Sequence, residues 1–157
     1  MNIRVRKLNE NSFHSSGTYV IYRIRVNRRS SMNFGLDFAI ETANQAGLPV
    51  LVLEECISEG SNDRFHTFVL EGVPENAKNF RKAGTGYIFH LAPTGISARK
   101  VFLKLARQAF AVIADDYPGS GFREENEQSA STVHCAYQVV DSNCIVPINE
   151  FEKREYA

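Results

Sequence analysis

The chain has 157 residues, of which 43% are hydrophobic and 23% are charged. This composition is that of an ordinary globular protein and excludes disordered and collagen-like chains. Eighteen basic residues balance eighteen acidic ones, which argues against a dedicated nucleic-acid coat. No apolar run approaches the roughly 18 residues of a transmembrane helix, so we expect no membrane association.

The charges are unevenly distributed along the chain. Residues 1–30 carry seven arginines and lysines against one glutamate, whereas acidic residues outnumber basic ones nine to three after residue 113. We expect the two ends to neutralise each other in the fold. Three cysteines, Cys56, Cys135 and Cys144, have no metal-ligand spacing, and they predict reduced thiols and a cytoplasmic location.

The first half of the chain predicts a strand, a helix and a second strand. Residues 1–18 are polar and predict a surface arm. Residues 19–26 are β-branched, aromatic and basic, which favours a buried strand. Apolar residues then recur at helical spacing up to Gly47, and Ser30 or Ser31 is the expected N-cap. With a strand at residues 50–53, this segment forms a βαβ unit with parallel strands.

The second half continues the alternation. A helix is expected from Asn62, with an apolar stripe that ends or kinks at Pro74, and Ser97 is the expected cap of a later helix. Further strands are expected at residues 87–91, 110–114 and 137–140, a short helix at 122–129, and a surface-wrapping tail at 141–157. The pattern predicts one domain over residues 1–157, a three-layer α/β/α sandwich whose Rossmann-like sheet has five parallel strands in the order 3-2-1-4-5.

Ligands of such sheets bind outside the carboxyl ends of the strands, where the strand order reverses. In the predicted order this point lies between the first and fourth strands, whose ends supply Arg25, Arg28 and Arg29 on one side and Asp115 and Asp116 on the other. One interpretation is an arginine-lined mouth for a phosphate or another anion. The other is that the arginines pair with the adjacent aspartates and hold the sheet end together. No glycine-rich phosphate loop, metal spacing or catalytic set of residues is visible.

Several segments also match, in order, a known family pattern. They are Arg4-Val5-Arg6-Lys7-Leu8-Asn9, Tyr19-Val20-Ile21-Tyr22, Arg29 with Asn33 and Leu36, Phe68-Val69-Leu70-Glu71-Gly72, Asp115 with Pro118, Val140-Asp141 with Asn143 and Pro147, and Glu155-Tyr156-Ala157. Together they resemble the N-terminal α/β domain of class II cyclobutane-pyrimidine-dimer DNA photolyases, in the photolyase/cryptochrome superfamily. The matches span nearly the whole chain.

The departures from that pattern bear on function. The family has a tryptophan where Arg23 stands and a leucine-arginine pair at Gly119-Ser120. We expect these positions to lie at antenna-side and interdomain surfaces, which favours a free-standing relative over a fragment. The helical domain that would bind FAD is missing, so by this resemblance the chain is a lyase-related module that is not catalytic alone. FAD would bind only if such a helical domain were supplied.

Three functions follow as hypotheses. The first is an antenna-chromophore or scaffold module of DNA photorepair that holds a deazaflavin or flavin. Its candidate cofactor-binding residues are Arg25, Arg29, Asn33, Asp115, Asp116 and Asn143. The second is a free-standing nucleotide-binding module, and the third is a non-enzymatic dimerisation or docking domain. Expected partners are a helical flavin domain or subunit and a second copy of the chain, with DNA contacted only indirectly.

Overall fold

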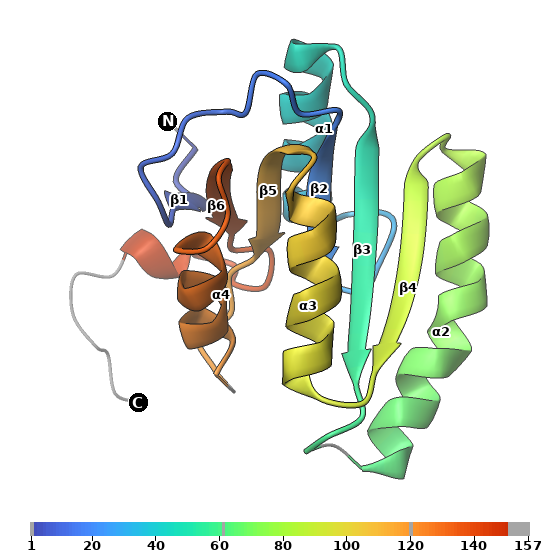
Figure 1. Cartoon of the computed structure of the whole chain (residues 1–157). Helices are drawn as coiled ribbons and strands as arrows, with labels where there is room; N and C mark the ends of the chain where they lie inside the picture. The colour runs from blue at the N-terminus through green and yellow to red at the C-terminus, as the bar shows by residue number, and fades with distance from the viewer. Residues whose placement is uncertain (1, 61, 120, 151–157) are drawn as a thin grey trace.

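A six-stranded mixed sheet lies between two layers of helices (Figure 1). The computed structural model describes residues 2–60, 62–119 and 121–150. The strands are β1 (Val5–Lys7), β2 (Tyr19–Ile24), β3 (Val50–Ile57), β4 (Gly86–Ala92), β5 (Ala109–Asp115) and β6 (Ala136–Val140). The helices are α1 (Phe34–Ala46), α2 (Asp63–Lys82), α3 (Gly95–Ala106), α4 (Phe122–Ala130) and the short 3-10 helix η1 (Ile148–Glu150).

The sheet order is β1-β6-β5-β2-β3-β4. The three-layer α/β prediction is confirmed, and β2 to β6 are parallel and follow the predicted order 3-2-1-4-5. The strand count was wrong, because β1 adds a sixth, antiparallel strand beside β6, with Val5 opposite Val140. This strand lies inside the expected surface arm. Its three residues are too few to show the period-two alternation that reveals a strand. Of the expected tail, residues 151–157 lie outside the described part of the chain.

Each face of the sheet has its own hydrophobic core. On one face, α1 and the C-terminal half of α2 cover residues such as Val20, Val52 and Ile113, and Phe80 is the buried contact from α2. On the other face, Phe102 and Ala106 of α3 and Ala130 of α4 pack on the sheet. Figure 1 shows α3 and α4 in front of the sheet and α1 behind it.

Several element ends differ from their predicted positions. Asn33, not Ser30 or Ser31, caps α1 by accepting from the backbone N–H groups of Gly35 and Leu36. Thr94 caps α3, and Ser97, at the third helical position, completes the capping box. Pro74 does not end the helix, as one form of the prediction had it, because α2 continues through it.

Two strands also end at other positions than predicted, and in β3 the reason is that Glu54 and Glu55 are buried. β3 runs to Ile57 rather than ending at Leu53, and it pairs with β4 through Glu54 and Glu55. β2 stops at Ile24, two residues earlier than expected.

Gly17 is required by a close approach of two backbones. A Cβ atom at this position would lie 2.3 Å from the backbone nitrogen of Phe110, at the start of β5. Backbone atoms cannot move aside as a flexible side chain can. The chain therefore enters β2 along a path that only glycine permits.

Replacing Gly17 with alanine should lower the free energy of unfolding by about 1–3 kcal/mol, the usual cost of overpacking. The matched control is Gly72→Ala, inside α2, where an added Cβ meets nothing within 4 Å. Because alanine is the better helix former, this control should raise the free energy of unfolding by about 1 kcal/mol. Urea unfolding followed by circular dichroism measures both, and equal effects of the two substitutions would contradict the packing argument.

Candidate binding site at the carboxyl ends of the strands

Arg23 of β2 is a buried cation at the centre of this edge of the sheet. Its side chain is 1% exposed, and its Nε donates to Glu55 Oε2 of β3 at 2.6 Å. Its Nη1 donates to Glu125 Oε1 of α4 at 3.1 Å, and its guanidinium lies 4.2 Å from the centre of the Phe102 ring. Burial by itself lowers the pKa of Arg23, but the carboxylates of Glu55 and Glu125 outweigh it and the net shift is upward. Arg23 is therefore a permanent positive charge that the two glutamates compensate.

Arg25 extends the same group of charges toward solvent. Its guanidinium pairs with Glu125 and lies 4.7 Å from the centre of the Phe122 ring. Burial, with the neighbouring Arg23 charge, lowers the pKa of Arg25. Burial would raise the pKa of Glu125, but the two arginines lower it below its ordinary value. We call Arg23, Arg25, Glu55 and Glu125 the α4-side cluster.

A second group of polar residues lies on the opposite face of the sheet, under α2. Arg28 Nη1 donates to Glu54 Oε1 at 3.1 Å. The other Glu54 oxygen accepts from Asn76 Nδ2 at 3.0 Å and from the Tyr87 hydroxyl at 2.8 Å. Burial and this carboxylate raise the pKa of Tyr87. Arg23 and Arg28, the two arginines that reach β3, are thus both neutralised by glutamates of that strand.

Asp115 anchors the loop between β2 and α1. Its Oδ2 accepts from the backbone N–H groups of Arg25, Val26 and Asn27 at 2.9–3.1 Å, and its Oδ1 accepts from the Tyr22 hydroxyl at 2.7 Å. These bonds replace the strand ladder and explain why β2 ends at Ile24. Burial, followed by the Asp115 charge, raises the pKa of Tyr22 well above its ordinary value. Asp115 therefore has a complete set of structural partners.

The other predicted residues do not converge on one site. Asn33 is 1% exposed and is occupied in capping α1 and in donating to the carbonyl oxygens of Asn27 and Arg29. Asp116 pairs with Arg6 and Arg123 on the β6 side. The side chains of Arg29 and Asn143 are exposed. The idea that local carboxylates neutralise the arginines agrees with the geometry, although the partners of Arg25 and Arg28 are glutamates rather than the two aspartates.

A cavity of about 340 Å³ opens beside the α4-side cluster, and we call it the rim cavity. Its lining comprises two arginines, two glutamates, two phenyl rings and two further residues: Arg25, Arg28, Glu55, Glu59, Phe65, Phe122, Ile57 and Gly60. Glu55 Oε1 is buried and has no hydrogen-bond partner among the described residues. The volume lies at the lower end of the range for small-molecule sites. The lining charges cancel, so the cavity suits a flat, uncharged ring that donates a hydrogen bond better than it suits a phosphate.

The sequence aligns with a known repair enzyme along 98% of its length. Over 157 residues it is 31% identical to the deoxyribodipyrimidine photo-lyase of Methanothermobacter thermautotrophicus. The matched region is the N-terminal part of that protein. The chain is thus similar to the N-terminal α/β part of a photo-lyase. It spans about a third of the length of that relative, 34%. No family model matches the sequence.

Solved structures with this fold include universal stress proteins. One from Archaeoglobus fulgidus, determined in complex with dAMP, superposes with a TM-score of 0.53 at 18% identity, covering 80% of this chain and 99% of that one. One from Pseudomonas aeruginosa superposes with a TM-score of 0.55 at 13% identity, covering 81% of this chain and 48% of that one. At these identities the likeness shows the α/β fold alone.

Arg23 corrects one expectation drawn from the family pattern. We expected this departure from tryptophan to lie at a surface, but the side chain is buried against Phe102. Sequence reasoning also missed Glu55 and Glu125. An available signal was that charged residues at 23, 54 and 55 follow directly from apolar strand residues and so need buried partners.

The described parts of the chain lack two features that are often found at functional sites. No helix there is long and apolar enough to cross a membrane. Likewise, residues 2–60, 62–119 and 121–150 contain no group of three histidine, cysteine or acidic side chains placed to hold a metal ion.

Substituting Glu125 with glutamine should lower the free energy of unfolding by about 1.5–3 kcal/mol at neutral pH, because hydrogen bonds to two charged groups are weakened. The folded-state pKa of Glu125 is depressed, so its stabilisation is present above the ordinary value of 4.5 and is lost as the pH falls through the folded pKa. Urea unfolding of both proteins across the acid range measures this difference.

The control is Glu127→Gln, two residues further along α4 and exposed to solvent. It should change stability by less than about 0.5 kcal/mol at every pH. A Glu125→Gln effect that stays constant as the pH falls would show that the ion pairs contribute nothing.

Proposed function

We propose that this chain is the chromophore-holding α/β module of a light-driven DNA-repair protein. The observation that carries the proposal is the alignment with a photo-lyase along nearly the entire chain. The chromophore would be a flavin or deazaflavin in the rim cavity. A bound ring of this kind supplies light absorption, and the residues of this chain would bind and orient it.

The chemistry of the rim cavity supports this choice of ligand. Phe65 and Phe122 offer aromatic faces for stacking, which favours flat rings with centroids about 4.5–7 Å away. The unpartnered Glu55 Oε1 would accept from a ring N–H, and the guanidinium of Arg28 would donate to a ring carbonyl. The edge of a flavin's pyrimidine ring carries both kinds of group. Of the six residues expected to bind the cofactor, only Arg25 lines this cavity.

The nucleotide-binding alternative finds less support at this edge of the sheet. The guanidinium groups of Arg23, Arg25 and Arg28 all bond to carboxylates, so a phosphate would have to displace a glutamate. Such displacement costs the pairing energy of a partly buried ion pair. The proposed partner of the module is a helical flavin domain or subunit, and the module would contact DNA only through that partner.

The purified protein should bind riboflavin or a deazaflavin with one site per chain, seen as near-ultraviolet and blue absorbance that stays with the protein through gel filtration. Phe65→Ala should raise the dissociation constant about tenfold or more, because the stacking of a flat ring on an aromatic side chain is worth about 1–3 kcal/mol. Fluorescence quenching of the ligand on titration measures the constant.

Phe68→Ala is the matched control, because Phe68 is 74% exposed on the same helix and lies outside the rim cavity lining. Its affinity should equal that of the unmodified protein. A colourless protein that shows no saturable quenching with either ring would overturn the chromophore proposal. Saturable binding that both variants retain would remove the ligand from the rim cavity.

A further inference from the structure

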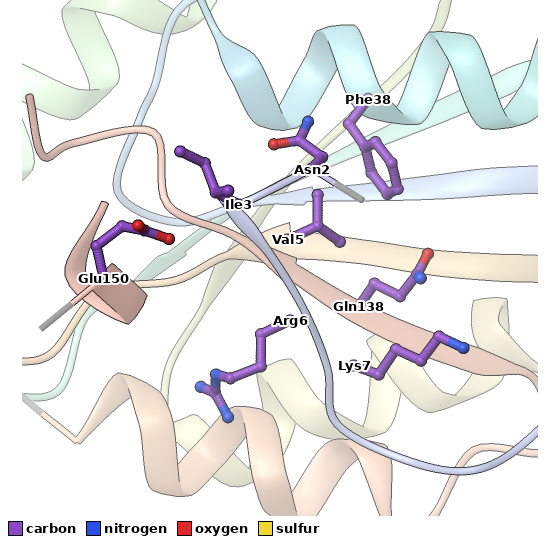
Figure 2. Close-up of a pocket in the computed structure, with 8 residues that line it drawn as sticks. All are labelled: Asn2, Ile3, Val5, Arg6, Lys7, Phe38, Gln138 and Glu150. Atoms are coloured by element: carbon purple, nitrogen blue, oxygen red, sulfur yellow. The ribbon is translucent and has the colours of Figure 1, made fainter. Parts of the chain in front are cut away.

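A larger cavity, of about 720 Å³, lies at the opposite end of the sheet, against β1 and β6 (Figure 2). Its lining combines apolar, amide and charged side chains: Ile3, Val5, Phe38, Asn2, Gln138, Arg6, Lys7 and Glu150. It shares no residue with the rim cavity. We call it the β1–β6 cavity.

The register of the sheet explains why this cavity exists. Val5 lies opposite Val140 and Lys7 opposite Gln138, so these side chains point to the face that carries α1. α1 packs over β2 and β5 and reaches this end of the sheet with Phe38. Among the described helices none packs extensively on β1, although Val5 borders the core under α1. The sheet surface beside Phe38 is therefore open to a ligand.

Gln138 is the observation that points to a ligand. Its side chain is 9% exposed, and Oε1 is buried without a hydrogen-bond partner in the described structure. The amide nitrogen also makes no hydrogen bond to a described residue. A buried polar group without a partner costs about 1–3 kcal/mol, and a leucine of similar size would avoid that cost. The amide offers an acceptor and a donor side by side, the arrangement with which glutamine binds a nucleobase edge in two hydrogen bonds.

The residues around Gln138 indicate which other chemical groups the ligand should carry. Phe38 provides an aromatic face and Val5 an apolar floor, while Lys7 has no carboxylate within salt-bridge distance among the described residues. Arg6 points to the other face, where it pairs with Asp116. Glu150 lies at the far end of the cavity from Lys7 (Figure 2), so an anionic group is favoured only at the lysine end.

We infer that the β1–β6 cavity binds a mononucleotide: the base stacks on Phe38 and bonds to the Gln138 amide, and the phosphate lies toward Lys7. The volume falls within the range of small-molecule sites. The inference does not depend on a chromophore in the rim cavity. It also assigns a role to Lys7, one of the basic residues in excess among residues 1–30.

The test is calorimetric titration of the whole chain with AMP and UMP, beside adenosine and inorganic phosphate as partial ligands. We expect one saturable site for at least one nucleotide, with each partial ligand binding at least tenfold more weakly. Gln138→Leu and Lys7→Gln should each weaken nucleotide binding tenfold or more. In a ¹⁵N spectrum, the side-chain NH₂ signal that disappears in Gln138→Leu should shift on titration.

Lys104→Gln, an exposed change on α3, is the charge-matched control and should bind as the unmodified protein does. Phe65→Ala, which alters the rim cavity, should also leave nucleotide binding unchanged, so this result is separable from the chromophore test. If no nucleotide binds saturably, or if Phe65→Ala weakens binding while Gln138→Leu does not, the inference is wrong. Should Gln138→Leu fail to fold, Phe38→Leu takes its place: weaker nucleotide binding supports the inference, and unchanged binding overturns it.

Discussion

The buried guanidinium of Arg23 joins its own strand, β2, to three further elements of the fold. It bonds from β2 to Glu55 in β3 and to Glu125 in α4, and it stacks on Phe102 of α3. A cation taken out of water is tolerable only when carboxylates and hydrogen bonds surround it. The arrangement therefore fixes where α4 sits. Helix α4 has few apolar side chains of its own and docks largely through polar contacts such as Asn126 with Tyr137 and the Asp115 carbonyl.

This internal compensation also decides what the carboxyl edge of the sheet can bind. In many sheets of this kind the edge presents unneutralised N–H groups and cations to a phosphate. Here Asp115 accepts hydrogen bonds from three backbone N–H groups, and glutamates form ion pairs with the arginines. What remains accessible is a neutral, partly aromatic recess. The end of the sheet at β1 and β6 has the opposite character, because Lys7 and the Gln138 amide oxygen have no partner among the described residues.

The sequence predicted the parallel strands well, because apolar runs such as residues 110–114 and stops such as Gly47 depend on local chemistry. It did not reveal β1, whose pairing with β6 is a tertiary event. It also could not show which residues of the predicted site already have partners. Asn33, Asp115 and Asp116 have the residue types of a binding site, but their partners lie far away in the chain, and only the fold shows that those partners already occupy them.

The pairing of the first strand with the last has a consequence for how the protein is made. Val5 can pair only after Val140 has been synthesised, 135 residues later. At about 5–20 residues per second, that interval is roughly 7–27 s. During translation the central strands can assemble while the amino-terminal segment is still without its neighbour. The sheet can therefore gain β1 as its edge strand only after β6 has been made.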